Sequence, residues 1–88
     1  METIEIKTKI EDEKGWVFGV RVGDVSYKVD VGRGNYERLT GGKVTPEELV
    51  EKSFKFLLAR EPKEAILKSF NIMEIQRYFP EYESEILK

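Results

Sequence analysis

The first third of the chain alternates between apolar and polar residues with a period of two. Three segments follow this pattern, at residues 2–11, 16–22 and 25–31. A period of two with one apolar face is typical of a half-buried antiparallel strand. The segments are joined by a five-residue polar loop at 11–15 and by Gly23-Asp24, a glycine-first loop that suits a type I′ or II′ turn. The pattern therefore predicts a three-stranded antiparallel β-meander.

The loop lengths also predict the register of this meander. The turn at Gly23-Asp24 gives the pairs Val22–Val25, Val20–Tyr27, Phe18–Val29 and Trp16–Val31. The loop at 11–15 gives the pairs Ile10–Trp16, Thr8–Phe18, Ile6–Val20 and Ile4–Val22. All of these residues then share one face, and a slip of one residue would turn the apolar set of one strand to water. We expect Trp16 to be buried on the central strand beneath the helices, close to Phe18 and Tyr27.

The second half of the chain carries helix signals. Thr45-Pro46-Glu47-Glu48 combines an N-cap threonine, a proline at the first helical position and a glutamate three residues after the cap. This capping box predicts a helix that runs to about Arg60, because Pro62 disfavours helical geometry in the residue before it.

Two further helices are predicted after this one. Pro62 suits the first turn of a helix over 62–70. Asn71-Ile72-Met73-Glu74 repeats the pattern of a cap followed by glutamate and begins a helix that Pro80 ends near Phe79. The tail 81–88 is expected to add one turn through Tyr82, Ile86 and Leu87.

Between the strands and the helices lies a glycine-rich segment with no clear periodicity. Within it, residues 36–39 fit either a short fourth strand or a turn of helix. The apolar face of the strands needs a cover, which the helices supply. We therefore predict one α+β domain over 1–88, with the meander and glycine-rich crossover at 1–44 and a layer of about three helices at 45–88.

Composition narrows the possible chemistry. The chain has 88 residues, a net charge of −2, no cysteine and no histidine. It therefore lacks the usual thiol nucleophile, the usual general base and the usual zinc ligands. We expect a protein that is not an enzyme and has no metal and no cofactor. Charged residues are mainly Glu and Lys and amides are few, as in thermophilic proteins.

The glycine-rich segment is the predicted binding site. Arg33, Tyr36, Arg38 and Lys43 lie in it, and arginine and tyrosine are favoured contact residues on loops. The segment matches neither the Walker loop nor the dinucleotide fingerprint. Its simplest interpretation is a crossover from sheet to helix. Its functional interpretation is a cationic surface for an anionic ligand or an acidic protein.

Nucleic-acid binding is the alternative function. Residues 62–79 fit a helix–turn–helix that presents Gln76 and Arg77, and Arg33, Arg38, Lys43 and a mildly basic sheet face would add phosphate contacts. Residues 45–88, however, hold seven Lys and Arg against nine Asp and Glu. A DNA reader is expected to show a basic stripe, so this alternative is not favoured.

Three blocks of the C-terminal half, residues 45–50, 53–64 and 78–83, resemble a small family of uncharacterised prokaryotic proteins. They cover roughly a third of the chain, and the resemblance brings no activity, ligand or catalytic residue with it. The chain has no apolar run long enough to span a bilayer, and Met1 leads into a strand rather than a signal peptide. We expect a cytoplasmic, non-enzymatic binding or regulatory module that contacts a protein or an anionic ligand.

Overall fold

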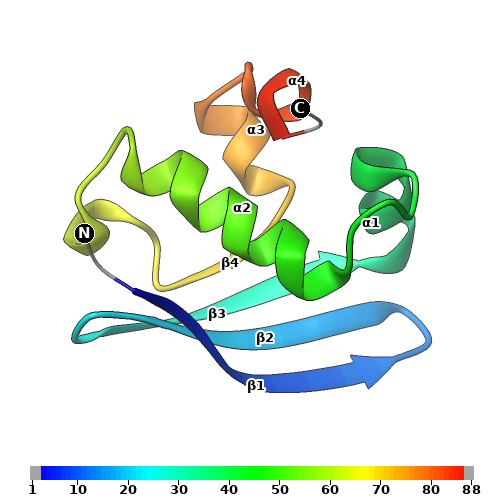
Figure 1. The fold of residues 1–88 in the computed structure, drawn as a ribbon, viewed down its shortest axis with the longest axis horizontal. Coiled ribbons are helices and arrows are strands. Elements are labelled where there is room, and N and C mark those ends of the chain that lie inside the picture. The colour runs from blue at the N-terminus through cyan, green and yellow to red at the C-terminus, as the bar shows by residue number, and fades with distance from the viewer. Residues whose placement is uncertain (1–2, 87–88) are drawn as a thin grey trace.

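The computed structural model describes residues 3–86, which form a sheet covered on one face by helices (Figure 1). The strands are β1 (Ile4–Asp12), β2 (Gly15–Val22), β3 (Val25–Gly32) and β4 (Ser69–Asn71), in this order across the sheet. The helices are α1 (Arg33–Thr40), α2 (Pro46–Leu58), the 3₁₀ turn η1 (Lys63–Ala65), α3 (Glu74–Tyr78) and α4 (Tyr82–Ile86). The predicted α+β class, meander and helical cover are confirmed. Glu2 of the predicted first strand lies outside the described residues.

The register between β2 and β3 is the one that the turn length predicts. Val22 pairs with Val25, Trp16 pairs with Val31, and the two inward pairs between them match as well. Gly23 adopts a φ of 60°, the left-handed conformation that this turn needs at its first position. As a result, the inward face of both strands is buried except at Val25, which is half-buried.

The register between β1 and β2 follows the prediction only as far as Ile6. A β-bulge at Lys7 then shifts the pairing, so that Thr8 lies opposite Gly19 rather than Phe18. A bulge places one extra residue in one strand and therefore reverses the facing of every residue beyond it. The predicted pairs of Thr8 and Ile10 are wrong for this reason.

The reversed facing brings charged residues of β1 onto the helical side. Ile10, predicted to point inward, lies on the outer face of the sheet and is 65% exposed. Lys9 faces the helices, where its ammonium lies 2.8 Å from the Glu47 carboxylate of α2. The bond to Lys9 lowers the pKa of Glu47 below its usual value. The bulge therefore replaces an apolar contact at this end of β1 with an ion pair.

The connection between β1 and β2 is also shorter than predicted. β1 continues to Asp12 and β2 begins at Gly15, which leaves a two-residue turn in place of the expected loop at 11–15. The Asp12 carboxylate accepts hydrogen bonds from the backbone N–H groups of Lys14 and Gly15, at 2.8 and 3.1 Å. An aspartate that bonds the backbone in this way makes a tight turn possible.

The fourth strand comes from the C-terminal half. Residues 36–39 belong to α1, whereas the predicted helix over 62–70 is wrong. There the chain forms η1 and then β4, which pairs in parallel with β3 and places Phe70 opposite Val29. Hydrogen bonds to β3 and burial of Phe70 outweigh the local preference for helix. The helix–turn–helix that was considered for 62–79 is consequently not formed.

The predicted cap of α2 is present, because Thr45 and Glu48 form a reciprocal capping box at its start. The predicted start of the next helix at Asn71 is wrong: Asn71 ends β4, and α3 begins at Glu74 without a side-chain hydrogen bond from its N-cap residue, Met73. Asn71 instead accepts a hydrogen bond from the Met73 N–H, and the Glu74 carboxylate accepts one from the Asn71 N–H in the turn before α3. The helix that follows, α3, is shorter than predicted. α4 supplies the expected last turn, and Leu87 lies outside the described residues.

One hydrophobic core joins the sheet to the helices. Trp16 is 7% exposed on the central strand, as predicted, and its aromatic neighbour is Tyr36 of α1, with ring centroids 5.2 Å apart. Tyr27 packs instead against Phe54 of α2, at 5.0 Å. The two ends of the sheet are thus covered by different helices, α1 at one end and α2 toward the other (Figure 1).

Candidate functional site

Two of the four predicted binding residues, Arg33 and Tyr36, lie against Trp16. The Arg33 guanidinium is 4.5 Å from the centre of the Trp16 ring. It donates hydrogen bonds to the Glu11 carboxylate at 3.0 Å and to the backbone carbonyl of Asp12 at 2.7 Å. The Tyr36 hydroxyl donates to the backbone carbonyl of Val44. These contacts fasten α1 to the end of the sheet.

The other two predicted residues have different neighbours. The Arg38 guanidinium lies 3.4 Å from the Glu83 carboxylate of α4 and 3.6 Å from the Met73 sulfur. Lys43 follows a turn in which Gly41 and Gly42 both have left-handed φ values. Its ammonium makes no ion pair with any residue of 3–86. The structure therefore joins Arg33 and Tyr36 at one point and directs Arg38 toward another part of the molecule.

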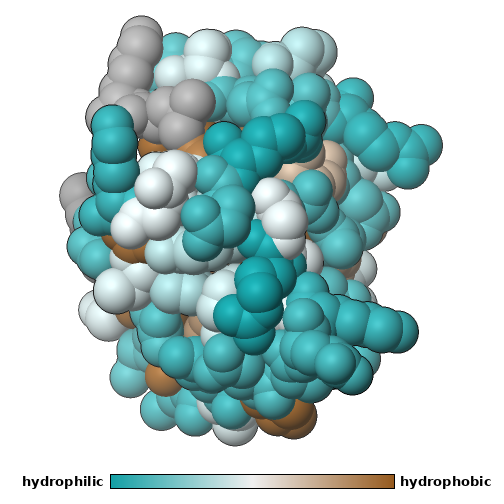
Figure 2. Space-filling model, turned by 90° about the vertical axis from the view of Figure 1, so that its right-hand side faces the viewer, coloured by the Kyte–Doolittle hydropathy of each residue, from teal (hydrophilic) through white to brown (hydrophobic). Residues whose placement is uncertain are grey.

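The side of the molecule on which α1 lies is mainly hydrophilic (Figure 2). Both of its predicted arginines already contact a carboxylate. An anion would compete there with Glu11 or Glu83 for the guanidinium groups. The cationic site predicted for residues 32–43 stays a prediction.

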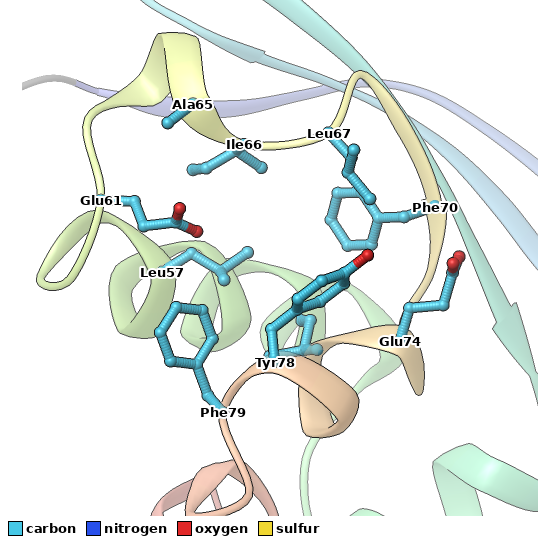
Figure 3. Close-up of a pocket in the computed structure, with 10 residues that line it drawn as sticks. Leu57, Glu61, Ala65, Ile66, Leu67, Phe70, Glu74, Tyr78 and Phe79 are labelled. Carbon is cyan, nitrogen blue, oxygen red and sulfur yellow. The ribbon is translucent and has the colours of Figure 1, made fainter.

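A hollow lies elsewhere, between α2, η1, β4 and α3 (Figure 3). Its volume is about 150 Å³. Buried apolar side chains form its floor, and these are Leu57, Ile66, Phe70 and Ile75. At its rim Leu67 is 49% exposed and Tyr78 is 66% exposed. We call this hollow the α2–α3 pocket.

The wall of the pocket opposite α3 is held in place by the sheet. The Tyr27 hydroxyl donates to the backbone carbonyl of Lys63, whose ammonium lies 3.1 Å from Asp24. Farther along, the Lys28 N–H donates to the Lys68 carbonyl and the Ile72 N–H to the Asp30 carbonyl, both at 2.8 Å. The segment is thus anchored to the sheet on both sides of residues 65–67.

Among residues 3–86, the only charged side chains that line the pocket are two carboxylates, Glu61 and Glu74. They lie on opposite sides of the hollow, and the Glu61 carboxylate points into it (Figure 3). One Glu74 oxygen accepts the Asn71 N–H at 2.7 Å. Neither carboxylate forms an ion pair within residues 3–86. The pocket is therefore apolar inside and acidic at two points of its margin.

The described lining of the pocket is apolar except for the two carboxylates and the Tyr78 hydroxyl. Its lining contains neither a serine nor a lysine, and no group of three acidic residues within 3–86 is placed to hold a metal ion. Ser53 lies outside it and is fully buried, where its hydroxyl donates to the Leu49 carbonyl at 2.7 Å and shares a bond of 2.7 Å with the Tyr82 hydroxyl. These groups stabilise the core.

Sequence patterns did not single out the α2–α3 pocket. Its apolar residues belong to the set that was expected to cover the sheet as helices. The pocket arises because residues 62–71 leave α2, join the sheet as β4 and return at α3. Pro62 was the one local signal, since it marks where the chain turns away from α2.

Comparison with protein-family models, with curated proteins and with solved structures finds no match to this chain. Among the helices of residues 3–86, none is long and apolar enough to cross a membrane.

Proposed function

We propose that the protein is a small non-enzymatic binding module and that it binds a segment of a partner protein in the α2–α3 pocket. One observation carries this proposal: a hollow of about 150 Å³ opens beside two large, exposed apolar side chains, Leu67 and Tyr78. Apolar side chains grouped at a concave surface are typical of interaction sites. Hydrogen bonds to the sheet also hold one wall of the pocket in place, which lowers the ordering cost of binding.

The alternative site at residues 32–43 has weaker support. Arg33 and Arg38 each contact a carboxylate, and the two side chains have different neighbours. Exposed charge pairs contribute little to affinity in water. A partially exposed apolar pocket contributes more, because binding removes its surface from water.

The test uses a displayed library of short random-sequence peptides, selected on the folded protein. Ala65→Phe places a larger side chain at an exposed position of the pocket lining and leaves the core residues unchanged. Ile10→Ala is the matched control, because Ile10 is as exposed as Tyr78 but lies on the outer face of the sheet. We expect selected peptides to bind the wild type and Ile10→Ala and to lose binding to Ala65→Phe.

Two results would contradict the proposal. One is a selection that enriches no peptide above background. The other is a set of peptides that bind Ala65→Phe as tightly as the wild type, provided that circular dichroism shows the variant to be folded. In either case the α2–α3 pocket is not the binding site.

A further inference from the structure

We propose that the segment bound by the α2–α3 pocket is basic, with one large apolar side chain flanked by lysine or arginine. This inference rests on the proposed function and names the chemistry of its partner. It is carried by the size of the hollow, by the sign of the charges at its margin and by the aromatic rings around it.

The size of the hollow fits a single side chain. An apolar cavity of about 150 Å³ lined by leucine, isoleucine and phenylalanine holds a molecule of the size of benzene. The α2–α3 pocket has this volume and this kind of lining, with Leu57, Ile66 and Phe70 among its walls. A leucine, isoleucine or phenylalanine side chain from a partner matches it.

The charges at the margin have one sign. Glu61 and Glu74 flank the hollow, no lysine or arginine lines it, and neither carboxylate is neutralised by an ion pair within residues 3–86. A partner with acidic side chains beside its apolar residue would be repelled at both points. A partner with basic side chains would be attracted, and complementary charge sets both specificity and association rate.

Arg60, Lys63 and Lys68, three basic residues near the pocket, have contacts elsewhere in the molecule, and Arg77, which is exposed on α3, makes no ion pair with Glu61 or Glu74. The Arg60 guanidinium lies 3.6 Å from the centre of the Phe56 ring and 3.2 Å from Glu81. Lys63 pairs with Asp24 across the sheet side of η1. The Lys68 ammonium is 5.9 Å from the centre of the Tyr27 ring. The acidic margin is consequently available to cations that a partner supplies.

The aromatic rings favour the same partner. Tyr78 extends along one side of the hollow with its ring exposed, and Phe79 lies next to it (Figure 3). The face of an aromatic ring attracts an ammonium or guanidinium group. The long aliphatic stems of lysine and arginine also pack on apolar surface while their charge remains in water. Carboxylates and aromatic rings around one pocket are thus suited to a basic segment.

The experiment measures fluorescence anisotropy with three labelled peptides. The first has a leucine between two lysines on either side, the second has glutamates in place of the lysines, and the third has glycine in place of the leucine. Each is titrated with the wild type, with Glu61→Gln/Glu74→Gln and with Glu13→Gln. Glutamine keeps the acceptor for the Asn71 N–H. Glu13 is an exposed carboxylate in the β1–β2 turn and serves as the matched control.

We expect the lysine peptide alone to bind the wild type. Its affinity should fall about five- to tenfold in Glu61→Gln/Glu74→Gln and stay unchanged in Glu13→Gln, because two partly exposed charge pairs are lost. It should also fall at high salt, where exposed charges are screened. Equal affinity of the lysine and glutamate peptides, or an unchanged affinity in the double variant, would overturn the inference.

The failure of this inference differs from the failure of the proposed function. If library peptides that depend on the pocket are not basic, the binding function stands and the basic partner is wrong. If no peptide responds to Ala65→Phe, the function itself is wrong. A dimer in sedimentation that Ala65→Phe dissociates would show that a second copy of the chain fills the pocket, which would overturn the basic partner as well.

Discussion

The Tyr27 hydroxyl donates a hydrogen bond to the backbone carbonyl of Lys63, and this bond ties the sheet to the wall of the α2–α3 pocket. Tyr27→Phe removes the hydroxyl but keeps the ring that packs against Phe54. We expect a loss of about 1 kcal/mol in unfolding free energy and faster amide hydrogen exchange at Ala65 and Ile66. Affinity for pocket-binding peptides should fall, because their binding site is less well held.

Tyr36→Phe is the matched control for this variant. It also removes a hydrogen bond from a tyrosine to a backbone carbonyl, that of Val44, but on the α1 side of the sheet. It should lower stability by a similar amount and leave peptide affinity unchanged. If both variants weaken binding equally, the effect comes from general destabilisation, and the account of the pocket wall is wrong.

The bulge in β1 predicts a coupling between Thr8 and Gly19. A Cβ at Gly19 would lie 2.3 Å from the Thr8 hydroxyl oxygen, so Gly19→Ala forces Thr8 to move. We expect Gly19→Ala to lower the unfolding free energy by about 0.5–1.5 kcal/mol, the cost of forcing the Thr8 side chain out of its rotamer. Thr8→Ala should restore most of that loss when the two substitutions are combined.

A double-mutant cycle of urea denaturation measures this coupling. The cycle distinguishes the two possible registers. Thr8 lies opposite Gly19 in the observed register and would lie opposite Phe18 in a register without the bulge. Additive losses in the double variant would mean that Thr8 and Gly19 are not neighbours, and the bulge would then be misplaced.

Alkaline pH should destabilise the protein through Tyr82. Burial raises the pKa of Tyr82 to about 12, against an ordinary value of 10.0. The unfolded chain therefore loses this proton at a lower pH than the folded one. The contribution of Tyr82 to the unfolding free energy is therefore fully present below pH 10 and is lost as the pH rises toward 12. A difference of two pKa units corresponds to a loss of about 3 kcal/mol in unfolding free energy once the pH reaches the upper of the two pKa values.

Thermal unfolding below pH 10 and between pH 10 and 12 tests this prediction. Tyr82→Phe should be less stable than the wild type at neutral pH, because Ser53 loses a hydrogen-bond partner. Since phenylalanine has no proton to lose, this variant should not show the loss of stability at alkaline pH that Tyr82 causes. Tyr78→Phe, at an exposed position, should keep the whole loss. Identical alkaline slopes in wild type and Tyr82→Phe would show that Tyr82 is not buried.

Short-range features of the fold could be predicted from the sequence. The capping box at Thr45 depends on residues three apart, and the β2–β3 register depends on a two-residue turn. The bulge at Lys7 could not be predicted, because the alternation of Ile4, Ile6 and Ile10 favours the register without a bulge. The bulge also brings Lys9 to Glu47, a contact between residues 38 apart in the sequence that no local pattern indicates.

The candidate site was missed for a similar reason. The spacing of Ile66, Leu67 and Phe70 fits a helix, whereas Phe70 belongs to a three-residue strand opposite Val29. Pairing of this kind depends on the completed sheet and leaves little local signal. Of the four residues that the sequence favoured, Arg33 and Arg38 are paired with carboxylates that lie distant in the chain.

The central claim is that binding occurs in the α2–α3 pocket, and a chemical-shift map tests it most directly. The lysine-flanked leucine peptide is titrated into ¹⁵N-labelled protein, and each amide shift is followed by NMR. We predict the largest shifts at Leu57, Ala65, Leu67, Phe70 and Tyr78, which line the pocket. Shifts concentrated instead at Arg33, Arg38 and Lys43, with the pocket unchanged, would contradict the account.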